Sequence, residues 1–194
     1  MPLVEGLTFV NNTLIAAGVR DKMKIICAGK VTSGFSIVRN LALGADLCNA
    51  ARAMMFSLGC IQALKCGSNK CPTGVATQDK DLMSGLDVST KSVRVRNYQS
   101  KTVEYAMDLV CSMGKKRPSE VSSNDVMRRV SSSQVKSLSD LYPKPKSNSF
   151  NDGTAPRDLM QFWLEGKAIY EGTYSDKIEY ILTYTPPPTI EKKY

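Results

Sequence analysis

The 194-residue chain contains no histidine. Histidine is the side chain that titrates near neutral pH, the usual base of Ser-His-Asp triads and a common metal ligand. Its absence excludes imidazole-based acid–base catalysis, such triads and imidazole metal ligands within this chain. Asp, Glu and Lys occur throughout, but none has a spacing that identifies it as a general acid or base. We therefore assign no catalytic residue.

Long apolar runs are also lacking, because no stretch reaches the ~18–20 residues that a membrane-spanning helix requires. The opening residues Met1 to Glu5 have neither the basic region nor the long apolar region of a secretory signal. Without such a signal, the six cysteines indicate a reducing compartment, where thiols serve metals or catalysis more often than disulfides. We expect a cytoplasmic protein with no membrane span.

The formal net charge of +8 invites a nucleic-acid interpretation, but the basic residues are scattered. The densest group is Lys115, Lys116 and Arg117, directly before Pro118, which is typical of a solvated helix end. No basic stripe interleaved with aromatic residues accompanies it. The sequence therefore predicts no nucleic-acid partner.

Helical and strand patterns alternate in the N-terminal part of the chain. Apolar spacing and glycine positions predict, in order, helix 3–18, strand 24–28, helix 35–43, strand 46–50 and helix 51–64. Gly18 and Gly44 are expected to end the first two helices. This alternation with short loops indicates a parallel sheet with crossover helices.

Two strands do not make a stable sheet alone, and a (β/α)8 barrel typically needs about 250 residues. The first expected element is a helix with no strand before it. We therefore expect an α/β fold that comprises the C-terminal βα units of a (β/α)8 TIM barrel, the tail of a larger protein.

The remaining sequence predicts a mainly helical extension. Arg94–Met113 has the pattern of an amphipathic helix that Gly114 ends, with a core face made of Val95, Tyr98, Val103, Ala106, Met107 and Val110. We expect one or two short helices within 118–136, a linker at 144–156, a short helix at 158–165 and a disordered tail at 191–194. The expected regions are 1–85, the barrel part with a cysteine loop; 86–145, the helical extension; and 146–194, the linker, short helix and tail.

Cys60, Cys66 and Cys71 have the spacing CxxxxxCxxxxC in a segment with several glycines. Thiolates suit iron–sulfur clusters and zinc, but a structural zinc site takes four ligands and no fourth lies nearby. Three ligands suit a three-iron cluster, in which each iron takes one protein sulfur. The alternative is that these are small buried apolar residues, and spacing alone leaves both open. Buried apolar positions are the interpretation we favour for the other three, Cys27, Cys48 and Cys111.

A phosphate site is suggested by the segments after the two expected strands. Gly29 follows the first strand, and Ala51 and Arg52 begin a helix after the second. Glycine lets the backbone approach a ligand closely, a helix N-terminus favours negative charge, and Arg can donate two hydrogen bonds to phosphate oxygens. The alternative is that the glycines here belong to ordinary turns between strand and helix.

Residues 44–78 (GADLCNAARAMMFSLGCIQALKCGSNKCPTGVATQ) closely resemble the segment after the last barrel strand in the FMN-binding domain of glutamate synthases. Residues 2–46 are similar to the preceding helix–strand–helix of that family, and the likeness continues more weakly to about residue 145. The chain thus resembles the FMN-binding glutamate synthase family.

The resemblance implies that Cys60, Cys66 and Cys71 hold a [3Fe–4S] cluster. It also implies that Gly29, Lys30, Ala51 and Arg52 contact the FMN phosphate. Two positions depart from the family: Gly67 stands where many members carry a His that is not a ligand, and Lys30 stands where many have Gly.

The resemblance further implies an oxidoreductase that aminates 2-oxoglutarate and reduces the product to L-glutamate. The nitrogen is ammonia or derives from glutamine, and the electrons come from a donor protein or NAD(P)H. We expect the chain to be an incomplete part of that enzyme. One alternative is a non-catalytic remnant or interaction module that keeps only the cysteine loop; another is a small zinc-binding nucleic-acid protein.

Overall fold

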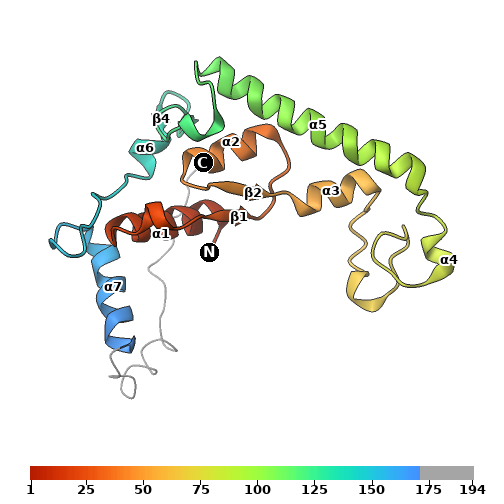
Figure 1. Ribbon diagram of the computed structural model, residues 1–194, viewed down its shortest axis with the longest axis horizontal. Coiled ribbons are helices and arrows are strands. Elements are labelled where there is room, and N and C mark those ends of the chain that lie inside the picture. Colours follow the sequence, from red (N-terminus) through yellow and green to blue (C-terminus); the bar gives the residue numbers. More distant parts are fainter. Residues whose placement is uncertain (171–194) are drawn as a thin grey trace.

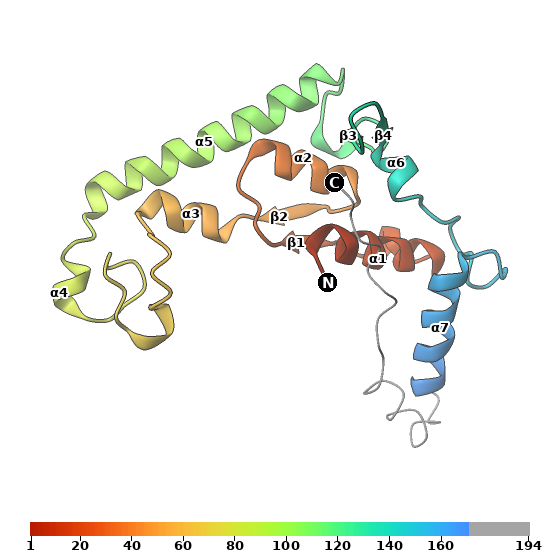
Figure 2. The same cartoon turned by 180° about the vertical axis from the view of Figure 1, so that it is seen from behind.

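The computed structural model describes residues 1–170, with side chains to residue 167, and it has a mixed α/β fold in an elongated arch (Figure 1). A small parallel sheet of β1 (Ile26–Ala28) and β2 (Leu47–Asn49) lies at the centre. The long helix α5 (Val88–Ser112) runs along α2 (Gly34–Ala42) and α3 (Ala51–Leu58), as both views show (Figure 2). The predicted α/β class is confirmed at this level.

The predicted helix–strand–helix–strand–helix order is confirmed. The first element is α1 (Leu3–Ala16), followed by a 3-10 turn at Arg20–Lys22, β1, α2, β2 and α3. Gly18 ends α1 as expected, because it adopts φ +71°, a conformation that residues with a side chain rarely take. The two strands are parallel, with Ile26 opposite Leu47 and Ala28 opposite Asn49.

One face of this sheet is covered. Cys27 is buried against Leu7 of α1 and Val38 of α2, and the same core extends to Val110 of α5. Side chains alternate along a strand, so Ile26 and its neighbour Leu47 point to the opposite face. They are 55% and 57% exposed. This second face of the sheet is therefore uncovered within the described residues.

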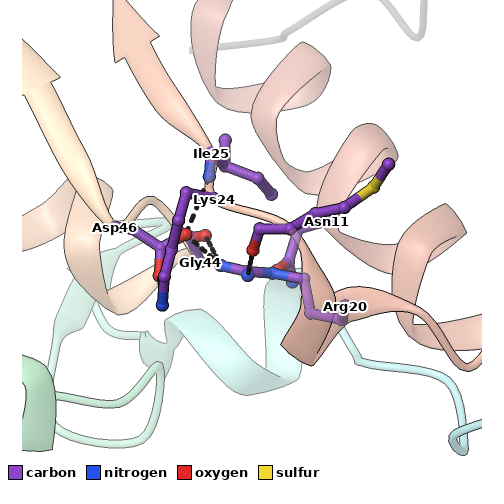
Figure 3. Close-up of polar contacts among 7 residues, drawn as sticks. Asn11, Arg20, Lys24, Ile25, Gly44 and Asp46 are labelled. Atoms are coloured by element: carbon purple, nitrogen blue, oxygen red, sulfur yellow. Dashed lines mark hydrogen bonds and ion pairs between the residues drawn. The ribbon is translucent and has the colours of Figure 1, made fainter.

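An ionic network joins the two strands to α1 (Figure 3). The Arg20 guanidinium donates to Asn11 Oδ1, to the Gly44 carbonyl and to Asp46 Oδ2, each at 2.8 Å. Asp46 Oδ2 also accepts the Ile25 N–H at 2.7 Å. Burial acts to raise the pKa of Asp46, but the Ile25 N–H and the nearby cations outweigh it and hold that pKa below its usual value.

The helix after β2 is shorter than predicted. It ends at Leu58, because Gly59 adopts the left-handed conformation with φ +108° and its N–H bonds to the Phe56 carbonyl. The predicted helical residues 59–64 therefore belong to the cysteine loop. That loop contains a 3-10 turn at Cys66–Ser68 and leads into the short helix α4 (Lys80–Met83).

Helix α5 begins six residues earlier than predicted, at Val88, because Asp87 accepts the N–H groups of Ser89 and Thr90 and caps it. Gly114 follows its end at φ +72°, as expected. The predicted core face is partly wrong: Thr102 is buried there, whereas Val103 is 46% exposed.

The expectation of helices within 118–136 is mostly wrong. Only a 3-10 turn forms at Pro118–Glu120, and a hairpin of β3 (Met127–Arg129) and β4 (Val135–Ser137) follows. Ser137 then starts α6 (Leu138–Leu141) with a capping box, in which its side chain and that of Asp140 bond each other's backbone N–H.

Residues 144–156 contain no helix or strand, and α7 (Arg157–Tyr170) extends beyond the predicted 158–165. The Trp163 ring stacks on Phe150 at a centroid distance of 4.4 Å, and Phe162 meets Phe9 of α1 edge-on at 5.5 Å. The predicted tail at 191–194 lies outside the described residues. Among those that are described, no helix has the length and apolar character to cross a membrane.

Candidate functional site

Two of the predicted phosphate-binding segments lie side by side at the carboxyl edge of the sheet. Because Ala28 pairs with Asn49, the residues that follow, Gly29 and Ala50, leave neighbouring strands at the same edge. Gly29 has φ +146° and Lys30 has φ +52°, so the backbone turns sharply there. This sharp turn exposes both residues after the strand.

The N-terminus of α3 also lies at this edge. Its N-cap residue, Ala50, has no side chain that could accept the first N–H groups, and Ala51 and Arg52 are exposed. At the start of α2, by contrast, Ser33 Oγ accepts the Ser36 N–H at 3.2 Å. The uncapped donors and the helix dipole make the start of α3 the better place for an anion.

The four predicted phosphate residues do not share one cavity. Gly29 and Lys30 line a cavity of about 570 Å³ with two further cations, Arg39 and Arg128. Arg52 lines a different cavity of about 390 Å³, beside the cysteine loop. The structure therefore places Arg52 between the strand edge and the loop.

All three cysteines of the loop line that second cavity. Cys71 is buried, Cys60 is half-buried and Cys66 is exposed, and all three are free thiols. The side chains of Arg52, Met55 and Phe56 from α3 form the rest of its wall, together with loop residues. The loop thus presents three soft donors to one space.

Local hydrogen bonds hold the loop. Asn69, at φ +60°, accepts the Gln78 N–H on its Oδ1 and the Thr77 hydroxyl on its carbonyl, both at 2.6 Å. Gly74 sits against the Leu82 carbonyl of α4, so closely that a Cβ there would clash. These contacts close the segment after Cys71 into a compact turn.

Cys71 has the character of a thiolate ligand. The Thr73 hydroxyl, 3.5 Å from its Sγ, and then the Ala76 and Thr73 N–H groups lower the pKa of Cys71 to about 7. A thiolate is the form that binds metals.

As placed, the three loop cysteines do not form a site for a single ion. Among the described residues, no group of three or more Cys, Asp or Glu side chains lies close enough to hold one metal ion. A single ion requires all sulfurs about 2.3 Å from one point. A three-iron cluster takes one sulfur per iron, so its ligands surround a space and need not converge. Three free thiols around one cavity suit that arrangement, and the cluster assignment itself stays a prediction.

Sequence reasoning missed a second thiol group. Cys27 and Cys48, interpreted as unrelated apolar positions, lie opposite each other in the sheet with their Sγ atoms 3.3 Å apart. Cys27 is buried as expected, but Cys48 is only half-buried and Cys111 is exposed. The contact depends on the register of the two strands, which the residue pattern does not give.

Comparison with known proteins gives one family match. Residues 1–116 match the model described as the conserved region in glutamate synthase. The chain is 38% identical to the glutamate synthase large subunit-like protein YerD of Bacillus subtilis over 73% of its own length and 27% of that protein. It is also 38% identical to the ferredoxin-dependent glutamate synthase 1 of Arabidopsis thaliana, over 42% of this chain and 5% of that protein.

A third relative is the archaeal-type glutamate synthase [NADPH] of a Thermotoga species, 28% identical over 59% of this chain and 22% of that protein. The chain therefore spans about a quarter or less of the length of these relatives. The matched region, residues 1–116, includes β1, β2 and the cysteine loop.

Proposed function

The chain belongs to the glutamate synthase family, and from this premise we propose that it forms the C-terminal part of an FMN-binding oxidoreductase domain. The reaction proposed for the whole protein is the amination of 2-oxoglutarate and reduction of the product to L-glutamate. The names of the relatives support this assignment, and they include both ferredoxin-dependent and NADPH-dependent enzymes. The nitrogen is ammonia or derives from glutamine, and the electrons come from a donor protein or NAD(P)H.

We assign β1 and β2 to a (β/α)8 barrel of which residues 1–85 are a part. The support is the uncovered sheet face, where Ile26 and Leu47 are more than half exposed. Parallel strands are normally buried on both faces. Further strands would close the sheet and bury these two side chains inside it, while α1 and α2 remain on the outer face with Cys27. Residues 86–145 form the proposed helical extension of this barrel, and 146–194 the linker, short helix and tail.

Cys60, Cys66 and Cys71 are the proposed ligands of a [3Fe–4S] cluster, which supplies one-electron transfer when bound. Their shared cavity and free thiols support the assignment. The residues of this chain shape the site: the turn closed by Asn69 and Thr77 fixes the position of Cys71. The Arg52 side chain adds a positive charge to the cavity wall, and this charge stabilises negatively charged thiolate ligands.

Gly29, Lys30, Ala51 and Arg52 are the proposed contacts of the FMN phosphate, and FMN supplies hydride transfer when bound. The residues present fit a phosphate group at the carboxyl edge, since the uncapped N–H groups of α3 face the same edge as the turn at Gly29. Lys30 adds a cation beside that turn. Arg52 lines the cavity of the cysteine loop. If it also contacts the phosphate, its guanidinium would lie between the FMN and the cluster.

The single observation that carries the proposal is the cavity lined by the three loop cysteines and Arg52 in a chain that matches the family over residues 1–116. Anaerobic purification of the full-length protein tests it. We expect bound iron and inorganic sulfide with visible iron–sulfur absorption. Cys60→Ser, Cys66→Ser and Cys71→Ser should each lose most of the iron, whereas Cys111→Ser, on α5, should retain it.

Full-length protein that carries no iron, or zinc in its place, would contradict the proposal. Equal iron contents in all four variants would contradict the choice of ligands. The overall reaction is tested separately, by following glutamate formation from 2-oxoglutarate with the same preparation.

A further inference from the structure

Cys27 and Cys48 form a sulfur–sulfur contact that the proposed function does not use. Their Sγ atoms lie 3.3 Å apart, and this is the sole sulfur–sulfur contact in the part of the chain that the structure describes. The two residues are direct register partners in the parallel sheet. The backbone register therefore makes the two cysteines neighbours on the same face of the sheet.

We propose that Cys27 and Cys48 are a modification site, a dithiol that a peroxide oxidises to a reversible disulfide between β1 and β2. Neighbouring strands lie about 4.8 Å apart, which is within the Cα separation of about 4.4–6.8 Å that a disulfide spans. The sulfurs need to approach by roughly 1.3 Å to reach bonding distance. The movement that this requires is a rotation of the two side chains.

The exposure of the two sulfurs sets the order of the reaction. Cys27 is 4% exposed, whereas Cys48 is half-buried, so a small oxidant reaches Cys48 first. The Cys48 sulfur attacks one peroxide oxygen, the O–O bond breaks, and water leaves with the thiol proton to give a sulfenic acid. The Cys27 sulfur then attacks the Cys48 sulfur, an S–S bond forms, the S–O bond breaks and a second water leaves. In sum, two thiols and one hydrogen peroxide give one disulfide and two waters.

A buried amide lies beside this pair. Asn40 of α2 is 0% exposed, and its Nδ2 forms no hydrogen bond within the described residues. Its side chain lies against Cys48 and favours the anionic form of that sulfur. An amide donor without another partner is suited to stabilise the anionic sulfur through which oxidation proceeds.

The surroundings of Cys48 also limit the rate at which its thiol is oxidised. Burial first, and then the neighbouring Cys27 thiol, raise the pKa of Cys48 to about 12. Cys48 therefore stays a neutral thiol near neutral pH, and the thiolate is the reactive form. The cross-link is expected under peroxide excess and not in a well-reduced compartment.

The cross-link would act on the edge described above. Cys27 and Cys48 each lie two residues before Gly29 and Ala50, where the strands end. A covalent bond between the strands would fix their spacing at that edge. An effect of the cross-link on phosphate binding rests on the proposed FMN phosphate site. Formation of the disulfide itself does not depend on that site.

Peptide mapping of the full chain tests the proposal, because trypsin places every cysteine in a different peptide. Cys27 lies in 25–30 and Cys48 in 40–52. The reduced protein is treated with hydrogen peroxide in native buffer, its remaining thiols are alkylated, and it is digested and analysed by mass spectrometry. We expect peptides 25–30 and 40–52 to be joined by a link that dithiothreitol removes.

Three controls sharpen the test. The link should persist in Cys111→Ser, whose cysteine lies on α5, and should be absent in Cys48→Ser. Oxidation of the same chain in denaturant should shift linkage toward Cys66 and Cys71, because the shorter loop closes at lower entropic cost.

The wild-type map decides the proposal by itself, so misfolding of a variant does not affect the outcome. Peptides 25–30 and 40–52 that stay unlinked in native buffer would overturn it. So would links from them mainly to the cysteine-loop peptides, or the same distribution of links with and without denaturant. The peptide map does not measure iron content. A negative result would therefore overturn the disulfide proposal without bearing on the cluster assignment.

Discussion

Arg20 Nη2 lies 2.8 Å from Asp46 Oδ2, and this ion pair joins the turn after α1 to the residue that precedes β2. The side chains are only 19% and 24% exposed. The same guanidinium also bonds Asn11 of α1 and the Gly44 carbonyl after α2. One side chain thus connects three segments at the amino edge of the sheet, opposite the edge proposed to hold phosphate.

Replacement of Arg20 by Ala is expected to lower the free energy of unfolding by about 2–4 kcal/mol, because it leaves the Asp46 carboxylate partly buried and without its nearest cation. Urea unfolding followed by circular dichroism measures the change. Lys101→Ala is the matched control, since Lys101 pairs with Glu104 at 2.7 Å but both side chains are more than half exposed. Its effect should be much smaller, because solvent screens an exposed pair. Equal losses in the two variants would contradict a special role for Arg20.

The Asp46 carboxylate should make stability depend on pH. Its pKa in the folded chain is lower than the ordinary aspartate value of 3.8, so the unfolded chain binds the proton more readily. The contribution of this group is fully present above the unfolded pKa and is lost as the pH falls through the folded pKa. We expect the free energy of unfolding to fall as the pH is lowered from about 5 to below the folded pKa.

Other carboxylates with lowered pKa values, such as Asp125 and Asp140, add to the same acid dependence. An Asp46→Asn variant separates them. Its unfolding free energy should vary less steeply with pH than that of the wild type over this range. An identical slope in the two proteins would show that Asp46 is not perturbed by its partners.

Local signals in the sequence predicted most of the N-terminal elements. Gly18 and Gly114 end helices because each adopts positive φ, and that preference is a property of glycine itself. Gly59 acts in the same way, but its signal was outweighed by the apolar residues that continue to Leu64. The β3–β4 hairpin was missed because its exposed Met127 and Val135 form no apolar run, and its existence depends on pairing between strands.

The candidate site was predictable only in part. The spacing of Cys60, Cys66 and Cys71 left a cluster and three buried apolar residues both open, and the structure adds that all three line one cavity. The Cys27–Cys48 contact depends on strand register, and a shift of one residue would have placed the two sulfurs on opposite faces. The pattern of either strand alone does not contain that information.

Gly34 permits the close packing of α2 on α5. A Cβ at this position would lie 2.6 Å from the Ala106 N atom and 2.9 Å from the Tyr105 carbonyl carbon, both backbone atoms that cannot rotate away. Gly34→Ala should therefore push the helices apart and lower the unfolding free energy by about 1–3 kcal/mol. Thermal unfolding measures the shift.

The control for this substitution is Gly166→Ala in α7, where a Cβ meets nothing within 4 Å. That variant should be unchanged, or stabilised by up to about 1 kcal/mol, because alanine favours a helix interior. A Gly34→Ala protein as stable as the wild type would mean that α5 does not pack on α2 as closely as described.

Arg52 lies on the wall of the cysteine cavity and is the second residue of α3, the helix whose N-terminus is proposed to hold the phosphate. If it donates to the FMN phosphate, Arg52→Ala should weaken FMN retention by a factor of about ten, since a hydrogen bond to a charged group contributes about 1.5–3 kcal/mol. FMN released from the full-length holoprotein during dialysis is the quantity to measure. Arg94→Ala, an exposed residue of α5, is the matched loss of one positive charge and should leave retention unchanged. Loss of iron without loss of FMN in Arg52→Ala would assign the guanidinium to the cysteine cavity alone, and the phosphate would then depend on Lys30 and the backbone N–H groups.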